Sequence, residues 1–145
     1  MSNLLPILYA EDNENDIELT LEAFKECNLN NKIDVVKDGQ EVMDYLTYQG
    51  NYVNRKKVHP VLILLDIKMP KLDGIQALKM IKTNETLKTI PVVMLTSSSI
   101  EKDLVESYMI GANAYVVKPI NFEDFIETVK KIGAFWAIVN RTVES

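Results

Sequence analysis

The amino-acid sequence predicts an α/β protein with a doubly wound (βα)5 fold, in which helices cover both faces of a five-stranded parallel sheet. Short apolar runs alternate five times with segments of helical periodicity, which is the order of repeated strand and crossover-helix units. Most runs are continuously apolar, as expected for parallel strands buried on both faces. The length of 145 residues fits one domain, and a hydrophobic fraction of 47% is typical of a globular chain.

The five apolar runs are the predicted strands. They are Ile7 to Ala10, Ile33 to Val36, Val61 to Leu65, Ile90 to Leu95 and Ala114 to Val117. The fourth run is rich in β-branched residues, which favour a strand, although it contains Pro91. Right-handed crossovers between consecutive strands would place helices on both sides of the sheet.

Five segments carry apolar residues at helical spacing. They are Asn15 to Cys27, Gln40 to Tyr48, Ile75 to Lys82, Glu101 to Ile110 and Asn121 to about Val139. Gly111 is a predicted stop for the fourth helix, and Asn121 is a predicted N-cap for the fifth. The long connection from Gln49 to His59 is polar, and we expect it to be a mobile surface loop.

Composition excludes several classes of function. A net charge of -5 argues against a broad nucleic-acid footprint, which needs clustered Lys and Arg. The single cysteine, Cys27, rules out an intramolecular disulfide and suits a reducing cytoplasm. The single histidine, His59, falls on a predicted exposed loop and argues against a His/Cys zinc site. The first apolar run is too short for a membrane span or a signal peptide.

Polar residues follow the predicted strands at their carboxyl ends, the edge where open α/β sheets bind ligands. Glu11 and Asp12 follow the first strand, Asp66 the third, Thr96 the fourth and Lys118 the fifth. Three carboxylates on one rim repel each other unless a hard divalent cation such as Mg²⁺ joins them. A hydroxyl and an ammonium opposite them suit a bound anion, and aspartate can accept a phosphoryl group. The pattern therefore predicts phosphoryl transfer.

Four segments resemble the receiver domain of two-component response regulators, in the same order and over nearly the whole chain. They are residues 8–13, residues 62–70 with Asp73-Gly74, residues 91–97 and residues 111–119. The resemblance implies a flavodoxin-like fold with strand order 2-1-3-4-5. It implies a receiver domain over residues 1–140, a short tail over 141–145, and Mg²⁺ as the cofactor, for which Mn²⁺ can substitute.

The resemblance also implies a role for each acidic residue of the rim. Asp66 matches the aspartate that accepts the phosphoryl group. Glu11 and Asp12 match the acidic pair that holds the metal ion together with Asp66. The backbone carbonyl of Lys68 matches a further metal ligand.

The remaining site residues match the family's switch and its modulators. Thr96 matches the hydroxyl that moves to the phosphoryl group, and Tyr115 matches the aromatic residue whose rotamer follows it. Lys118 matches the lysine that pairs with the phosphoryl group. Lys68 and Ser98 stand at the two positions that influence how fast water attacks the phosphoryl group.

The last predicted helix nearly reaches the end of the chain, so we expect a stand-alone receiver whose output is a phosphorylation-dependent contact with another protein. Its partners would be a sensor histidine kinase and an unknown downstream protein, with no nucleic acid and no membrane. The long loop and residues 133–137 are similar to regulators that partner bacterial phytochrome-type kinases. That subgroup implies a homodimer through the fourth and fifth helices, in which Phe135 and Trp136 either cap the sheet's edge or pack against a second chain.

Two other functions compete with the signalling switch. A phosphohydrolase that forms an aspartyl phosphate commonly has a second aspartate two residues after the nucleophile, but Lys68 stands there. A phosphorylation-independent binding module would be expected to lose an acidic residue, the acceptor or the lysine, and all are present. We therefore expect a phosphorelay switch that catalyses only its own phosphorylation and slow autodephosphorylation.

Overall fold

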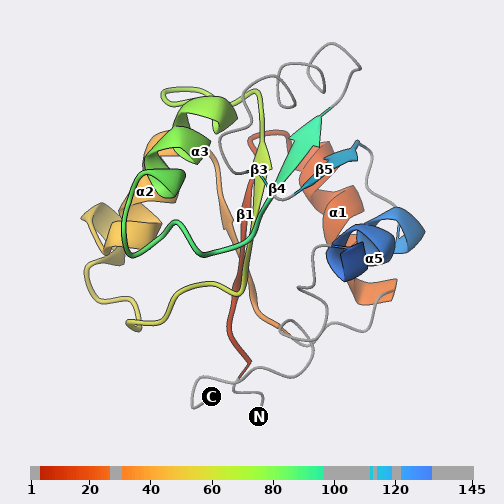
Figure 1. The fold of residues 1–145 in the computed structure, drawn as a ribbon. Helices are drawn as coiled ribbons and strands as arrows, with labels where there is room; N and C mark the ends of the chain where they lie inside the picture. The colour runs from red at the N-terminus through yellow and green to blue at the C-terminus, as the bar shows by residue number, and fades with distance from the viewer. Residues whose placement is uncertain (1–3, 27–30, 97–111, 113, 119–121, 132–145) are drawn as a thin grey trace.

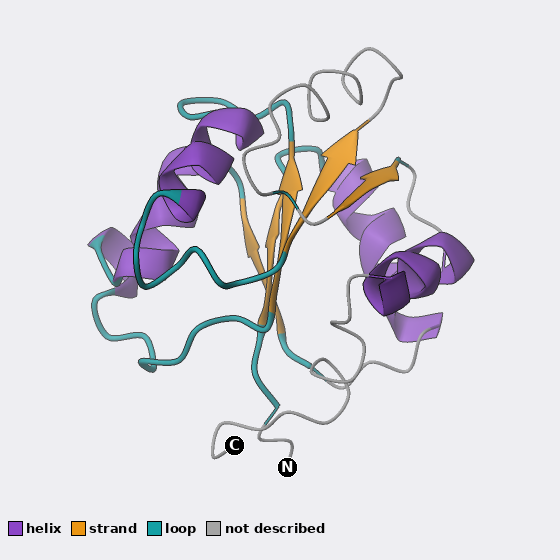
Figure 2. Ribbon diagram, in the orientation of Figure 1, coloured by secondary structure: helices purple, strands orange, loops and turns teal. Residues whose placement is uncertain are grey.

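The structure is a computed structural model, and it describes residues 4–26, 31–96, 112, 114–118 and 122–131. Five parallel strands form one sheet in the order β2-β1-β3-β4-β5. Helices α2 and α3 cover one face and α1 and α5 the other (Figure 1). Figure 2 shows the same three layers, with the strands between two groups of helices. The predicted fold class and strand order are confirmed.

The elements follow the predicted order. The strands are β1 (Ile7–Ala10), β2 (Ile33–Val36), β3 (Leu62–Asp66), β4 (Val92–Thr96) and β5 (Ala114–Val117). The helices are α1 (Glu14–Glu26), α2 (Gly39–Thr47), α3 (Gly74–Lys82) and α5 (Phe122–Lys131), with a 3-10 turn η1 (Gly50–Tyr52). The predicted helix over 101–110, its stop at Gly111, the cap at Asn121 and the helix beyond residue 131 lie outside the described residues, as does Cys27.

Two strands differ from their predicted bounds. β4 starts at Val92, because the preceding segment ends in a turn in which the Ile90 N–H donates to the Leu87 carbonyl at 3.0 Å. β3 and β4 also continue one residue further than their apolar runs, through Asp66 and Thr96. Backbone pairing continues past the last apolar side chain, so two of the predicted site residues belong to the sheet itself.

The register of the strands brings their carboxyl ends to one level. Ala10 lies opposite Leu65 on the neighbouring strand. Asp66 lies opposite Leu95, and Thr96 lies opposite Val117. The residues at the ends of four strands therefore share one rim of the sheet.

The core forms two layers, one on each face of the sheet. On the α1 and α5 face, Tyr9, Phe24 and Phe125 are almost fully buried, and the Phe24 and Phe125 rings lie 4.8 Å apart between centroids. On the other face, buried residues of α2 and α3 pack against Leu8 and Leu65. The central strands are buried at every position, which is why the sequence shows continuous apolar runs there. No helix among the described residues has the length and apolar character to cross a membrane.

Two aspartates form the N-caps of α2 and α3, the helices that cover one face of the sheet. The Asp38 side chain accepts a hydrogen bond from the Glu41 N–H at 2.7 Å and caps α2. Asp73 accepts from the Gln76 N–H at 2.8 Å while the Gln76 side chain accepts from the Asp73 N–H, a capping box for α3. These caps fix where each loop at the rim ends.

The connection between Gln49 and His59 makes side-chain contacts with α2, which the prediction of a polar surface loop did not include. The Tyr52 hydroxyl donates to Glu41 at 2.5 Å, and the Arg55 guanidinium donates to the carbonyls of Tyr45 and Val58. The guanidinium also lies 3.8 Å from the centre of the Tyr45 ring. These contacts pack the segment against α2, while His59 is exposed as predicted.

Gly74 lies directly behind the end of β3. A Cβ atom at this position would lie 2.2 Å from the Asp66 carbonyl oxygen and 2.9 Å from the Ile67 Cα. The Gly74 N–H also donates to the Ile67 carbonyl at 2.9 Å. The first turn of α3 therefore presses against the backbone that carries Asp66.

We expect Gly74→Ala to destabilise the protein by about 1–3 kcal/mol, because the added methyl group meets backbone atoms that cannot move without shifting β3. The preference of helices for alanine over glycine, about 1 kcal/mol, opposes this change but is too small to reverse it. Urea unfolding measures the difference. Met80→Ala, at an exposed position of the same helix, is the control, and a Gly74→Ala variant as stable as that control would contradict the prediction.

Candidate phosphoryl-acceptor and metal site

The carboxylates of Glu11, Asp12 and Asp66 meet at the carboxyl-end rim of the sheet. One oxygen from each lies within 4.8 Å of the others. Glu11 and Asp66 are buried, whereas Asp12 is exposed. Glu11 and Asp12 directly follow β1, and Asp66 ends the neighbouring β3, so the sheet register produces this cluster.

Lys118 contacts the cluster from the end of β5. Its Nζ atom lies 3.1 Å from Glu11 Oε1, 3.1 Å from Asp66 Oδ1 and 3.0 Å from Asp16 Oδ2. The backbone N–H of Lys118 donates to the Thr96 carbonyl at 2.8 Å, which fixes the lysine at the end of β4. The side chain of Lys118 is only 11% exposed, so these ion pairs are largely shielded from water.

Asp16 is a site residue that the sequence analysis did not identify. It lies in the first turn of α1, where acidic residues are common because they interact favourably with the helix dipole. Its one sequence signal is its place four residues after Asp12, at the start of the helix that follows the acidic pair. That signal has a local explanation and does not reveal the contact with Lys118.

The site is strongly anionic. Burial and the neighbouring Glu11 carboxylate raise the pKa of Asp66 to about 7, although Lys118 opposes this shift. Burial acts against the charge of Lys118, but the hydrogen bond to Asp16 and the charges of Asp66 and Glu11 raise its pKa above the ordinary value. The ammonium group therefore stays charged, and an ionised Asp66 needs further positive charge.

The donor set fits a hard divalent cation such as Mg²⁺ or Mn²⁺. Such cations prefer oxygen ligands and retain several waters, and the cluster offers three carboxylates with one of them open to solvent. Glu11, Asp12 and Asp66 are the residues that would hold the ion. The additional positive charge would compensate the repulsion that raises the pKa of Asp66.

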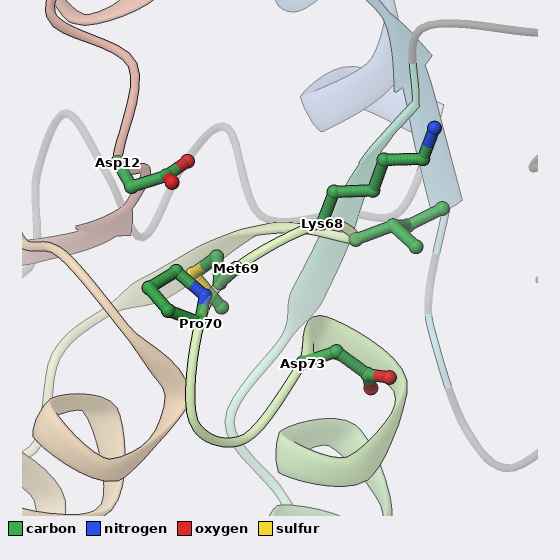
Figure 3. A pocket seen from close by; sticks show the side chains of 6 residues that line it. Asp12, Lys68, Met69, Pro70 and Asp73 are labelled. Atoms are coloured by element: carbon green, nitrogen blue, oxygen red, sulfur yellow. The ribbon is translucent and has the colours of Figure 1, made fainter.

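An open pocket of about 480 Å³ lies beside the cluster. Asp12, Ile67, Lys68, Met69, Pro70 and Asp73 line it. Figure 3 shows Met69 and Pro70 between Asp12 and Asp73, with the Lys68 side chain extending from the same loop. The Lys68 side chain is exposed, and its backbone follows β3 directly after Ile67.

The other predicted site residues are placed as follows. Thr96 ends β4 and is fully buried, and Tyr115 on β5 is partly buried against the core of the α2 and α3 face. Ser98 lies outside the described residues, as do Phe135, Trp136 and the surface of the predicted fourth helix. The structure thus brings Glu11, Asp12, Asp66 and Lys118 together.

The sequence is similar to that of known proteins over most of the chain. The family profile described as the response regulator receiver domain matches residues 7–130. Response regulator Rcp1 of Synechocystis sp. (strain ATCC 27184 / PCC 6803 / Kazusa) is 40% identical over 130 residues, which are 90% of this chain and 87% of Rcp1.

Solved structures agree with the sequence similarity. The bacteriophytochrome response regulator AtBRR has a TM-score of 0.89 at 49% identity, over 95% of this chain and 99% of AtBRR. The Mn²⁺-bound form of Rcp1 has a TM-score of 0.73 at 37% identity, over 96% and 97% of the two chains. The phosphorylated cyanobacterial phytochrome response regulator RcpA has a TM-score of 0.75 at 38% identity, over 97% and 99%.

We expect Asp66→Asn to stabilise the folded protein at about pH 8. A carboxyl group whose pKa is raised from 3.8 to about 7 opposes folding when ionised. Its ionisation therefore lowers the free energy of unfolding by nothing below about pH 4 and by the full amount above about pH 7. The expected gain is on the order of 2 kcal/mol, below the full effect of the pKa shift because the variant also loses the ion pair with Lys118.

Urea unfolding of the wild type and the variant across this pH range measures the effect, and the difference should narrow as the pH falls toward 4. Asp12→Asn is the matched control, because it removes a carboxylate of the same cluster from an exposed position. A difference in stability that does not change with pH would contradict the assignment of the cost to ionised Asp66.

Proposed function

Because this chain belongs to the family of response regulator receiver domains, we propose that Asp66 accepts a phosphoryl group from a sensor histidine kinase and that the phosphorylated chain signals through contact with another protein. One observation carries the proposal. The Asp66 carboxylate lies 3.1 Å from the Lys118 ammonium group, within a cluster of carboxylates that could bind a cation. A phosphoryl transfer site needs an oxygen nucleophile, a bound cation and positively charged donors; Asp66 would be the nucleophile, the acidic cluster would hold the cation, and Lys118 is the positively charged donor.

In the proposed reaction, a carboxylate oxygen of Asp66 forms a bond to phosphorus while the bond from phosphorus to the kinase histidine breaks. The histidine nitrogen leaves with the bonding electron pair and takes up a proton. The product is an acyl phosphate, and Lys118 balances part of the negative charge on its oxygens. A Mg²⁺ ion held by Glu11, Asp12, Asp66 and the Lys68 carbonyl would supply the remaining charge stabilisation.

The response to phosphorylation is assigned to Thr96 and Tyr115. Thr96 ends β4, and Tyr115 on β5 lies opposite Met94, two residues before Thr96 on β4. We propose that the Thr96 hydroxyl binds the phosphoryl group and that Tyr115 changes its rotamer with it, which alters the surface around β5. A shift between two such states is enough to change affinity for a partner.

The partner class follows from the relatives. AtBRR is a bacteriophytochrome response regulator and RcpA a cyanobacterial phytochrome response regulator, at 49% and 38% identity to this chain. We propose a phytochrome-like histidine kinase as the phosphoryl donor. We also propose that the receiver domain occupies residues 1–140, with residues 141–145 as a short tail.

Incubation with a small phosphodonor such as acetyl phosphate and Mg²⁺, followed by intact mass measurement, tests the acceptor. We expect one phosphoryl adduct that hydroxylamine removes, because acyl phosphates react with this nucleophile. Asp66→Ala should give no adduct, and a chelator should prevent it in the wild type. An adduct that persists in Asp66→Ala would show that another residue is the acceptor.

We expect Lys68→Asn to shorten the lifetime of the phosphoryl group on Asp66 roughly 3- to 10-fold, because the exposed lysine places a positive charge and a long side chain at the open pocket beside the acidic cluster. The loss of the adduct with time measures the rate. Lys71→Asn is the control, since it removes the same charge three residues away at a left-handed position that asparagine tolerates. Equal hydrolysis rates in the Lys68→Asn and Lys71→Asn variants would contradict the proposed effect of Lys68 on phosphoryl hydrolysis.

A further inference from the structure

Asp16 is a fourth carboxylate at the rim, and neither phosphoryl acceptance nor the cation cluster uses it. Its Oδ2 atom lies 3.0 Å from Lys118 Nζ. Its backbone carbonyl accepts a hydrogen bond from the Tyr9 hydroxyl at 3.4 Å, and its N–H donates to Asn13 Oδ1 at 3.0 Å. The first turn of α1 is therefore held against β1 with the Asp16 carboxylate beside the lysine.

The ammonium group of Lys118 has no N–H donor to spare. It carries three N–H groups, and three carboxylate oxygens from Glu11, Asp16 and Asp66 lie within 3.1 Å of it. A phosphoryl oxygen on Asp66 needs one of these donors in order to pair with the lysine. One phosphoryl oxygen can take the N–H that now faces Asp66, but a second can pair with the lysine only if Glu11 or Asp16 releases its hydrogen bond.

The surroundings of the three carboxylates indicate which one yields. The Glu11 side chain is fully buried and belongs to the cation cluster, and Asp66 itself carries the phosphoryl group. The Asp16 side chain is 28% exposed, so water can replace the lysine as its hydrogen-bond partner. Release of Asp16 therefore costs less free energy than release of Glu11, which would leave a buried carboxylate without its partner.

We propose that Asp16 is a positioning residue that restrains Lys118 in the unphosphorylated protein and competes with the phosphoryl group for one of its N–H donors. The proposal rests on Asp66 being the acceptor. The charge of Asp16 acts in the same direction as its hydrogen bond, because a carboxylate near a phosphoryl group repels it. Asp16 thus biases the resting protein toward its unphosphorylated state.

Binding of beryllium fluoride in saturating Mg²⁺ tests the competition, because this anion coordinates an aspartate oxygen in the place of a phosphoryl group and dissociates reversibly. We expect Asp16→Asn to bind it roughly 3- to 10-fold more tightly than the wild type, by calorimetry or by the ¹⁹F NMR signals of bound fluoride. Asp16→Glu, which restores the charge, should return the affinity toward that of the wild type.

Two controls separate this effect from net charge and from structural damage. Glu18→Gln removes the same charge from an exposed position of α1 and should leave the affinity close to that of the wild type. Binding of Mg²⁺ alone should not become tighter in Asp16→Asn, since the variant loses a negative charge near the cation cluster. A damaged site would bind both Mg²⁺ and beryllium fluoride more weakly, whereas release of Lys118 from Asp16 would strengthen the binding of beryllium fluoride alone.

The outcomes are distinct. An Asp16→Asn affinity equal to that of Glu18→Gln, or lower than that of the wild type, would overturn the proposed competition while Asp66 remained the acceptor. A wild type that forms no beryllium fluoride adduct dependent on Asp66, checked with Asp66→Ala, would overturn the proposed function and with it the role of Asp16.

Discussion

The site depends on one constraint, which is that two buried carboxylates share a single ammonium group. Glu11 and Asp66 both lie 3.1 Å from Lys118 Nζ, and Asp12 and Asp16 add further negative charge at the rim. Charges removed from water need partners, and one lysine cannot balance four carboxylates. The pKa of Asp66 is raised first by burial and second by the Glu11 charge, so it reflects both the loss of water and the neighbouring negative charge.

The scaffold keeps these charges together because fully buried strands lie directly beneath them. β1, β3 and β4 are buried at every position, so apolar burial offsets the electrostatic cost at their ends. Lys118 is held by its backbone bond to Thr96, and Gly74 allows α3 to approach the carbonyl of Asp66. The side chains of the site therefore have little freedom to separate.

The sequence predicts the sheet well because a parallel strand covered on both faces must be continuously apolar, and this pattern survives without knowledge of the neighbours. It predicts Asp66 and Lys118 because parallel strand ends meet at one edge. It does not predict Asp16, whose partner lies 102 residues away and depends on how α1 packs. It also does not predict that Tyr52 and Arg55 pack their loop on α2, because single hydrogen bonds from side chains to a carboxylate and a backbone carbonyl leave no periodic pattern.

The excess charge also determines how ligands at this site influence one another. A proton on Asp66 and a divalent cation relieve the same repulsion, so each makes the other less favourable. A cation and a phosphoryl group carry opposite charge, so each favours the other, and the coupling is reciprocal. A phosphoryl group added to an already anionic rim would need positive charge and hydrogen-bond donors, and Lys118, 3.1 Å from Asp66, already carries both. The electrostatic cost of the resting site is therefore what makes its state sensitive to a phosphoryl group.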